Sequence, residues 1–359
     1  MPVPRRLLIA AGVISAAAAG LEMQRRRDLA TVADDPEWEQ LNQPPQGEPV
    51  EVRSRDGTRL HAEIHGPEDG PAVVLCHGWL ETAELWQRQV TALAGACRVV
   101  TFDLRGHGRS AVPDDPAAYS DEHLADDLDA VFETCLYGGR SCVVAGHSMG
   151  GMAIVAWAGR NRGRVQQRLS GAVLVNTGVD QLLARQLVLG PLASGWTNAL
   201  VNKPALRFRQ SSLRQLDPVT LRVVRRIVGG SSTTPGQAAY YQRMFMAAPA
   251  PVRTGFGRTL GELDLRDSVA ALDAPSIVIS GRDDRLLPPV HAEELARMLP
   301  QLVEYAQLEG IGHMAPIEAA DEVTSRIRRL VPKPATRSAA GRGRRRSLAA
   351  ASKGRGGSE

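Results

Sequence analysis

Short runs of apolar and β-branched residues recur along this chain, and they constrain its fold more than any other feature. The runs lie at residues 72–76, 98–102, 142–145, 171–175 and 276–280. Strands that lack polar alternation are typical of a parallel sheet covered by helices on both faces. Segments with apolar residues at helical spacing separate the runs. The pattern therefore predicts an α/β fold with a mostly parallel central sheet flanked by helices.

The sheet is expected to open with an antiparallel pair of strands. Residues 49–53 and 60–64 flank Asp56-Gly57, a dipeptide typical of hairpin turns. The main helices are expected at residues 81–93, 121–136, 289–299 and 317–330, and a last strand at 302–308. Either Ser120 or Asp121 is suited to cap the second of these helices.

The regular alternation stops between about residues 180 and 260. That stretch keeps a helical pattern interrupted by Gly and Pro and contains no clear strand, and it is too long for a plain loop. We therefore expect a core formed by residues 48–180 and 261–332, with a helical lid at residues 181–260 inserted over the sheet.

The N-terminus carries a short apolar segment with arginines on both sides. Arg5 and Arg6 precede an uncharged run at residues 7–21, and three more arginines follow at 25–27. We interpret residues 1–27 as a signal peptide or a membrane anchor. This interpretation is favoured over a leader segment in a cytoplasmic protein. We therefore expect an exported or membrane-tethered protein, with membrane association through this end. The polar residues 28–47 are expected to form a linker.

The basic charge of the chain belongs to its C-terminal end. Residues 333–359 contain eight Lys or Arg and one Glu, so the net charge of +4 becomes −3 without them. This tail is rich in Gly, Ser and Ala and is expected to be disordered. The mildly acidic remainder argues against a specific nucleic-acid partner, although the tail leaves open a contact with anionic lipid or nucleic acid.

A G-x-S-x-G motif at Gly146, Ser148 and Gly150 follows the predicted strand at 142–145 and precedes a helical run. This is the context of a nucleophile elbow, in which a serine sits on a sharp turn from strand to helix. Glycines on both sides avoid collisions in so tight a turn. Ser148 is therefore the candidate nucleophile.

A serine needs a base, and the base needs an acid to orient it. His313 lies on a Gly-rich loop after the last predicted strand and is the candidate base. Asp284 follows the strand at 276–280 and is the favoured acid, with Asp283 in reserve and Asp180 third. The order serine, acid, histidine is the one described for nucleophile-elbow hydrolases.

An oxyanion intermediate requires two backbone N–H donors. Met149, directly after Ser148, is expected to supply one, and Trp79, after the flexible Gly78, the other. The Trp79 side chain either lines an acyl pocket or packs under the lid. Asp103 and Arg105, at the end of another strand, are interpreted as structural.

Five motifs together resemble the α/β-hydrolase family. They are HGW (77–79), FDLRGHGRS (102–110), GHSMGG (146–151), GRDDRLLP (281–288) and GIGH (310–313). The resemblance spans roughly residues 48–332 and implies the fold, the triad, the lid and the absence of a cofactor. Family members that are dehalogenases or epoxide hydrolases carry Asp at the nucleophile position, and Ser148 argues against both. The N-terminal segment also resembles lipases and esterases of actinobacteria.

The leading hypothesis is a serine hydrolase that cleaves a small carboxylic ester through an acyl-enzyme. Apolar residues of the predicted lid favour an apolar substrate; these are Leu182, Leu183, Leu187, Leu189, Leu192 and Trp196. The same triad also serves carbon–carbon or amide hydrolysis, acyl transfer and perhydrolysis. A tethered binding protein without activity is the alternative from another class. No metal site is expected, because His61, Glu63 and His65 do not have the H-E-x-x-H spacing.

Overall fold

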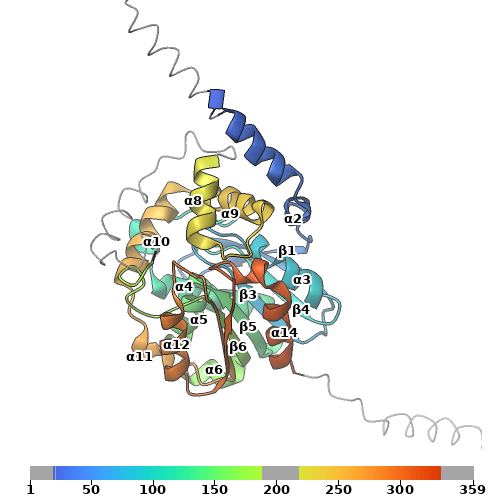
Figure 1. Ribbon diagram of the computed structural model, residues 1–359. Coiled ribbons are helices and arrows are strands. Elements are labelled where there is room, and N and C mark those ends of the chain that lie inside the picture. Colours follow the sequence, from blue (N-terminus) through green and yellow to red (C-terminus); the bar gives the residue numbers. More distant parts are fainter. Residues whose placement is uncertain (1–18, 21, 188–217, 333–359) are drawn as a thin grey trace, which may run out of the picture.

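The computed structural model of this protein describes residues 19–20, 22–187 and 218–332 (Figure 1). Within these ranges the strands form one sheet in the order β1-β2-β4-β3-β5-β6-β7-β8. Their bounds are β1 Glu48–Arg53, β2 Arg59–His65, β3 Ala72–Cys76, β4 Arg98–Phe102, β5 Cys142–His147, β6 Leu169–Val175, β7 Ser276–Gly281 and β8 Leu302–Leu308. β1, β2 and β4 pair antiparallel, and all other neighbours are parallel. The predicted α/β architecture and its opening hairpin are confirmed.

Helices cover both faces of the sheet (Figure 1). They are α3 Gln87–Leu93, α4 Asp121–Cys135, α5 Met149–Arg160, α6 Val165–Arg168, α11 Arg266–Val269, α12 Pro289–Met298, α13 Ala315–Glu318 and α14 Ala320–Leu330. Short 3-10 helices lie at η1 Ala83–Trp86, η2 Pro116–Ala118, η3 Tyr137–Gly139 and η4 Arg162–Arg164. Neighbouring residues of one strand enter opposite cores, since Val74 packs with α4 and α5 while Val73 and Leu75 pack with α3 and α14. This burial on both faces explains the wholly apolar runs.

Two predicted helices differ in detail from expectation. The segment at 81–93 begins as the 3-10 helix η1 before α3, and the segment at 317–330 is divided into α13 and α14 at Ala319. The backbone of Ala319 has φ −131° and leaves the helical region, which separates the two helices. In α4 the cap is Ser120, whose hydroxyl accepts a hydrogen bond from the His123 amide.

The segment predicted as a linker is partly ordered, which corrects that expectation. Residues 22–33 are helical, and α2 follows at Pro36–Leu41. Asp35 caps α2, and Leu41 is buried in the core between the sheet and α3. Because Leu41 is buried and Asp35 caps α2, this segment packs against the domain and is not a free linker.

Before α11, the chain between β6 and β7 contains three helices in its described part. These are α8 Pro218–Val228, α9 Pro235–Ala247 and α10 Ala250–Glu262, here called the α8–α10 insertion. Residues 188–217 of the predicted lid, including Leu189, Leu192 and Trp196, lie outside the described residues. So do most of the predicted N-terminal signal or anchor and the whole basic tail. Among the described residues, no helix has the length and apolar character needed to cross a membrane.

A buried ion pair fixes the loop after β4. Arg105 donates from Nε and Nη2 to the two carboxylate oxygens of Asp127, at 2.7 and 2.6 Å. Asp103 accepts hydrogen bonds from the amides of Ala83 and Arg109, both at 2.9 Å. Both residues therefore hold loops together, as the structural interpretation of this motif predicts.

Candidate active site

Ser148 lies at a sharp turn between β5 and α5. Its backbone has φ 52° and ψ −119°, a region that non-glycine residues rarely occupy. The strain is held by two hydrogen bonds: the Ser148 amide donates to Val175 O at 2.9 Å, and Thr177 Oγ1 donates to Ser148 O at 2.7 Å. The turn is thus fixed by the neighbouring strand β6.

The two motif glycines are required by close contacts. A Cβ atom on Gly146 would lie 2.5 Å from Gly150 O, and one on Gly150 would lie 2.3 Å from Cys76 O at the end of β3. Only hydrogen fits at either position. The tight turn places the N-terminus of α5 next to Ser148, where its amides favour negative charge.

His313 and Asp284 meet at the carboxyl edge of the sheet. His313 Nδ1 lies 2.7 Å from Asp284 Oδ2, and both side chains are buried. Asp284 Oδ1 accepts the amides of Leu286 and Leu287, each at 2.9 Å, which fixes the carboxylate. Burial acts to lower the pKa of His313, but the charge and hydrogen bond of Asp284 outweigh it and raise the pKa above 6.5.

The other two candidate acids are engaged elsewhere. Asp283 accepts a hydrogen bond from the Ser231 amide at 2.9 Å. Asp180 lies 3.6 Å from Arg266 Nε and accepts a hydrogen bond from Gln181. The geometry therefore favours Asp284 as the partner of His313.

Two polar residues that the sequence did not single out hold this pair in place. Asn176 Nδ2 donates to Asp284 Oδ2 at 2.8 Å and to Gly312 O at 3.1 Å. Glu318 accepts the amides of Gly312 and Gly230, both at 3.0 Å. Asn176 follows β6 at the carboxyl edge of the sheet, where functional side chains gather. That position is the only signal that could have identified it.

A third missed residue, Glu81, lies buried beside the nucleophile. Its Oε2 accepts the Gly78 amide at 2.5 Å and lies 2.9 Å from His147 Nδ1. His147 Nε2 donates to the backbone oxygen of His313 at 2.7 Å, because a carbonyl oxygen only accepts. Burial acts to raise the pKa of Glu81, but the charge and hydrogen bond of His147 lower it overall. The Glu81–His147 pair thus connects the loop after β3 to the His313 loop.

Two further buried histidines of the sequence motifs, His77 and His107, have structural partners. His77 Nε2 accepts the Leu104 amide at 3.0 Å, and His107 Nε2 accepts the Leu80 amide at 3.1 Å. Burial lowers the pKa of His77 to about 4 and that of His107 to about 3, so both are neutral near pH 7. They join neighbouring loops and do not line the cavity described next.

The segments that carry the predicted oxyanion donors lie next to Ser148. Met149 is the first residue of α5, where a backbone N–H has no acceptor within the helix. A Cβ atom on Gly78 would lie 2.9 Å from Ser148 Cβ, so the loop that carries Trp79 passes directly beside the serine. The Trp79 indole donates to Val252 O in α10 at 3.2 Å and borders the cavity.

Ser148 and His313 open into one cavity of about 310 Å³. Its wall comes from the sheet edge and from the α8–α10 insertion, and most of the lining is apolar. The apolar lining residues are Trp79, Leu80, Met152, Leu182, Leu183, Val224, Ile227, Val228, Phe245, Met246, Leu260, Leu286 and Leu287. Within the described ranges, no group of three or more His, Cys, Asp or Glu is arranged to hold a metal ion.

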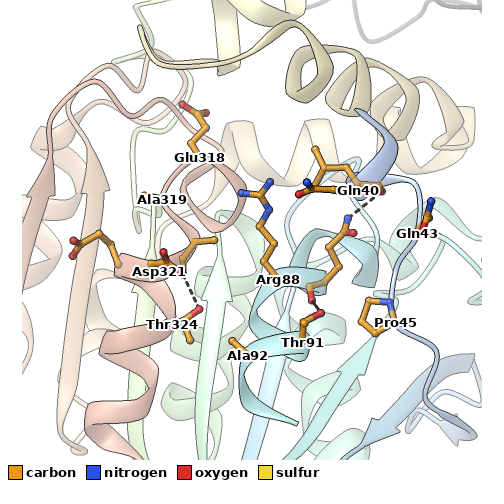
Figure 2. Close-up of a pocket in the computed structure, with 14 residues that line it drawn as sticks. Gln40, Gln43, Pro45, Arg88, Thr91, Ala92, Glu318, Ala319, Asp321 and Thr324 are labelled. Atoms are coloured by element: carbon orange, nitrogen blue, oxygen red, sulfur yellow. Dashed lines mark hydrogen bonds between the residues drawn. The ribbon is translucent and has the colours of Figure 1, made fainter. Parts of the chain in front are cut away.

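A second hollow, of about 490 Å³, is polar and lies where α2 and α3 meet α13 and α14 (Figure 2). Arg88 crosses it, donates to Ile317 O at 3.1 Å and pairs with Glu37 of α2. Its described lining contains no Ser, Cys or His. This hollow therefore lies at the seam between α2 and the rest of the domain.

Comparisons with known proteins agree on the type of fold. The model of a family described as the alpha/beta hydrolase fold matches residues 71–320. The chain is 29% identical over 281 residues to the Mycobacterium tuberculosis protein named probable oxidoreductase EphD, covering 74% of this chain and 46% of that protein. The chain thus spans less than half the length of that relative.

Two further relatives are covered almost completely. An epoxide hydrolase of Caballeronia sordidicola is 28% identical over 312 residues, which cover 77% of this chain and 91% of that protein. The solved structure of a thermophilic esterase from Thermogutta terrifontis is 27% identical, with a TM-score of 0.61, over 79% of this chain and 99% of the esterase. The similar proteins thus carry names of more than one activity.

Proposed function

This chain belongs to the α/β-hydrolase family, whose model matches residues 71–320, and on that premise we propose that it cleaves carboxylic esters through an acyl-enzyme. The observation that carries the proposal is the arrangement of Ser148, His313 and Asp284. The serine lies on a strained elbow, it shares a cavity with the histidine, and the histidine is bound to the buried carboxylate at 2.7 Å.

The chemistry of the nucleophile separates ester cleavage from epoxide opening. Attack of a carboxylate on an epoxide gives an ester, which water then hydrolyses. Attack of Ser148 on an epoxide would give an ether, which water does not cleave under the same conditions. Attack of Ser148 on an ester gives a second ester, which can turn over. The serine at position 148 thus favours esters, although one relative is named an epoxide hydrolase.

In the proposed mechanism, Ser148 Oγ attacks the carbonyl carbon as its proton moves to His313 Nε2. The oxyanion accepts hydrogen bonds from the Met149 and Trp79 amides. The intermediate expels the alcohol, which takes the proton from His313, and water then repeats the sequence to release the acid. Asp284 orients the imidazole and stabilises its charged form. The mostly apolar wall of the cavity favours an apolar chain on the substrate.

Labelling by a fluorescent fluorophosphonate tests the proposal, because such a probe reacts with an activated serine and releases fluoride. We expect the wild-type protein to be labelled and to hydrolyse p-nitrophenyl esters, and Ser148→Ala to do neither. If wild-type protein that is folded by circular dichroism is not labelled, the proposal is wrong and a binding function takes precedence.

A further inference from the structure

Arg253, in α10, introduces a positive charge into the mostly apolar wall of the candidate catalytic cavity. It lines that cavity together with Ser148 and His313, and the residue is buried, with a relative exposure of 7%. Buried arginines are rare unless they are paired. The charge of Arg253 therefore requires a compensating group.

The contacts of Arg253 within the described chain are all to neutral carbonyl oxygens. Nε donates to Ala248 O at 3.0 Å, and Nη2 donates to Phe245 O at 3.1 Å and Met246 O at 2.9 Å. These carbonyls belong to the C-terminal end of α9, whose partial negative charge is about half an elementary charge. Nη1 makes no hydrogen bond to a described residue, so one edge of the guanidinium is not used by the helix cap.

The other charged groups of the cavity are paired with partners outside it. Glu81 contacts His147, and His313 contacts Asp284. No salt bridge joins Arg253 to a carboxylate in the described residues, whose ion pairs involve other arginines and histidines. Burial lowers the pKa of Arg253, and no acidic group there opposes this effect. An anion from outside the fold would therefore gain a strong interaction.

Arg253 follows Val252, which contacts the loop beside the nucleophile. Val252 O accepts the indole N–H of Trp79 at 3.2 Å, and Trp79 follows the glycine that lies against Ser148. The cavity of about 310 Å³ is at the small end of the range for ligand sites. One small molecule can therefore reach both Ser148 and Arg253.

We propose that Arg253 binds a carboxylate carried by the ester substrate, so that the enzyme prefers monoanionic esters to neutral ones. This inference rests on the proposed ester hydrolysis. A single guanidinium in an apolar wall fits a monoanion, whereas a doubly charged phosphate would leave one charge uncompensated. Arg253 is thus a specificity-determining residue, and its contacts with α9 hold it in position.

The test compares two p-nitrophenyl esters of the same shape. One is the monoester of adipic acid, with a free terminal carboxylate, and the other carries a primary amide in place of that carboxylate. At pH 7.5 we expect wild-type kcat/KM to be about 10- to 100-fold higher for the carboxylate, as for a hydrogen bond to a charged group. Arg253→Gln should lose this preference, and Arg253→Lys should keep part of it.

The matched control is Arg258→Gln, which removes an exposed arginine of the same helix that donates to Pro116 O and does not line the cavity. It should keep the wild-type preference. The inference is overturned if wild-type enzyme hydrolyses the amide ester at least as fast as the carboxylate ester, or labels with fluorophosphonate yet cleaves neither ester. If Arg253→Gln does not fold, the wild-type ratio decides alone. Absence of both labelling and hydrolysis would instead refute the proposed function.

Discussion

The carboxyl edge of the sheet and the α8–α10 insertion form opposite kinds of wall around the same cavity. At the sheet edge each position admits few residues, because Gly146 and Gly150 have no room for a side chain and Ser148 sits in a strained turn. In the insertion the lining is mostly apolar, and many side chains of similar volume would serve there. In the proposed function, a few fixed positions thus determine the reaction, whereas substrate selection depends on the shape of a larger surface.

The two regions are nevertheless joined by hydrogen bonds. The His313 amide donates to Val228 O at the end of α8, at 2.7 Å. Glu318 binds the amides of Gly312, in the histidine loop, and Gly230, just after α8. The proposed base and part of the cavity wall therefore share one support, and substitutions can test how far their effects separate.

The largest effect is expected at the acid of the sheet edge. In Asp284→Asn the carboxylate that orients His313 becomes an amide, and we expect kcat to fall about 10³- to 10⁴-fold, as in other triads. Asp283→Asn is the matched control, because the Asp283 carboxylate accepts the Ser231 amide of the insertion loop, whereas the Asp284 carboxylate binds His313. Steady-state hydrolysis of a p-nitrophenyl ester measures both. Equal losses in the two variants would contradict the assignment of Asp284.

A smaller effect is expected at Glu81, which connects the loop of Trp79 to the histidine loop through His147. In Glu81→Gln the contact with His147 loses its charge, and we expect kcat to fall about 10- to 100-fold. The inflection of the pH profile should also move to lower pH, since Glu81 contributes to the raised pKa of His313. Glu84→Gln, which removes an exposed carboxylate three residues away, is the control. An unchanged pH profile in Glu81→Gln would limit Glu81 to a structural role.

The pH dependence of the wild-type enzyme follows from the sign of the His313 shift. His313 accepts a proton from Ser148 only in its neutral form, and Asp284 raises its pKa above 6.5. We therefore expect kcat/KM to fall about tenfold per pH unit on the acid side of an inflection that lies above pH 6.5. A plot of kcat/KM against pH from 5 to 9 measures this. An inflection below 6.5 would show that burial, not Asp284, dominates.

The sequence predicts more of the sheet edge than of the α8–α10 insertion. Ser148, Asp284 and His313 stood out because their neighbours form short motifs in a recognisable order along the chain. Glu81 and Glu318 did not, because their partners are distant in sequence or are backbone amides, which leave no local pattern. Helix α2 was missed since a polar segment with one buried leucine resembles a linker. The cavity wall required the tertiary structure itself.

The smallest effect is expected in the insertion, where only selectivity should change. Ile227 of α8 lines the cavity. Ile227→Ala enlarges the cavity because it removes methyl and methylene groups from the wall. Because one methylene in an apolar pocket is worth about 1–3 kcal/mol at most, we expect the ratio of kcat/KM for octanoyl over butyryl p-nitrophenyl esters to rise about 3- to 10-fold. Val223→Ala, on the exposed side of the same helix, should leave the ratio unchanged. Fluorophosphonate labelling should stay at the wild-type rate in both variants, because the residues at the sheet edge are intact. If Ile227→Ala instead slows labelling as much as ester hydrolysis, the α8 backbone that accepts the His313 amide has moved, and the two walls cannot be separated.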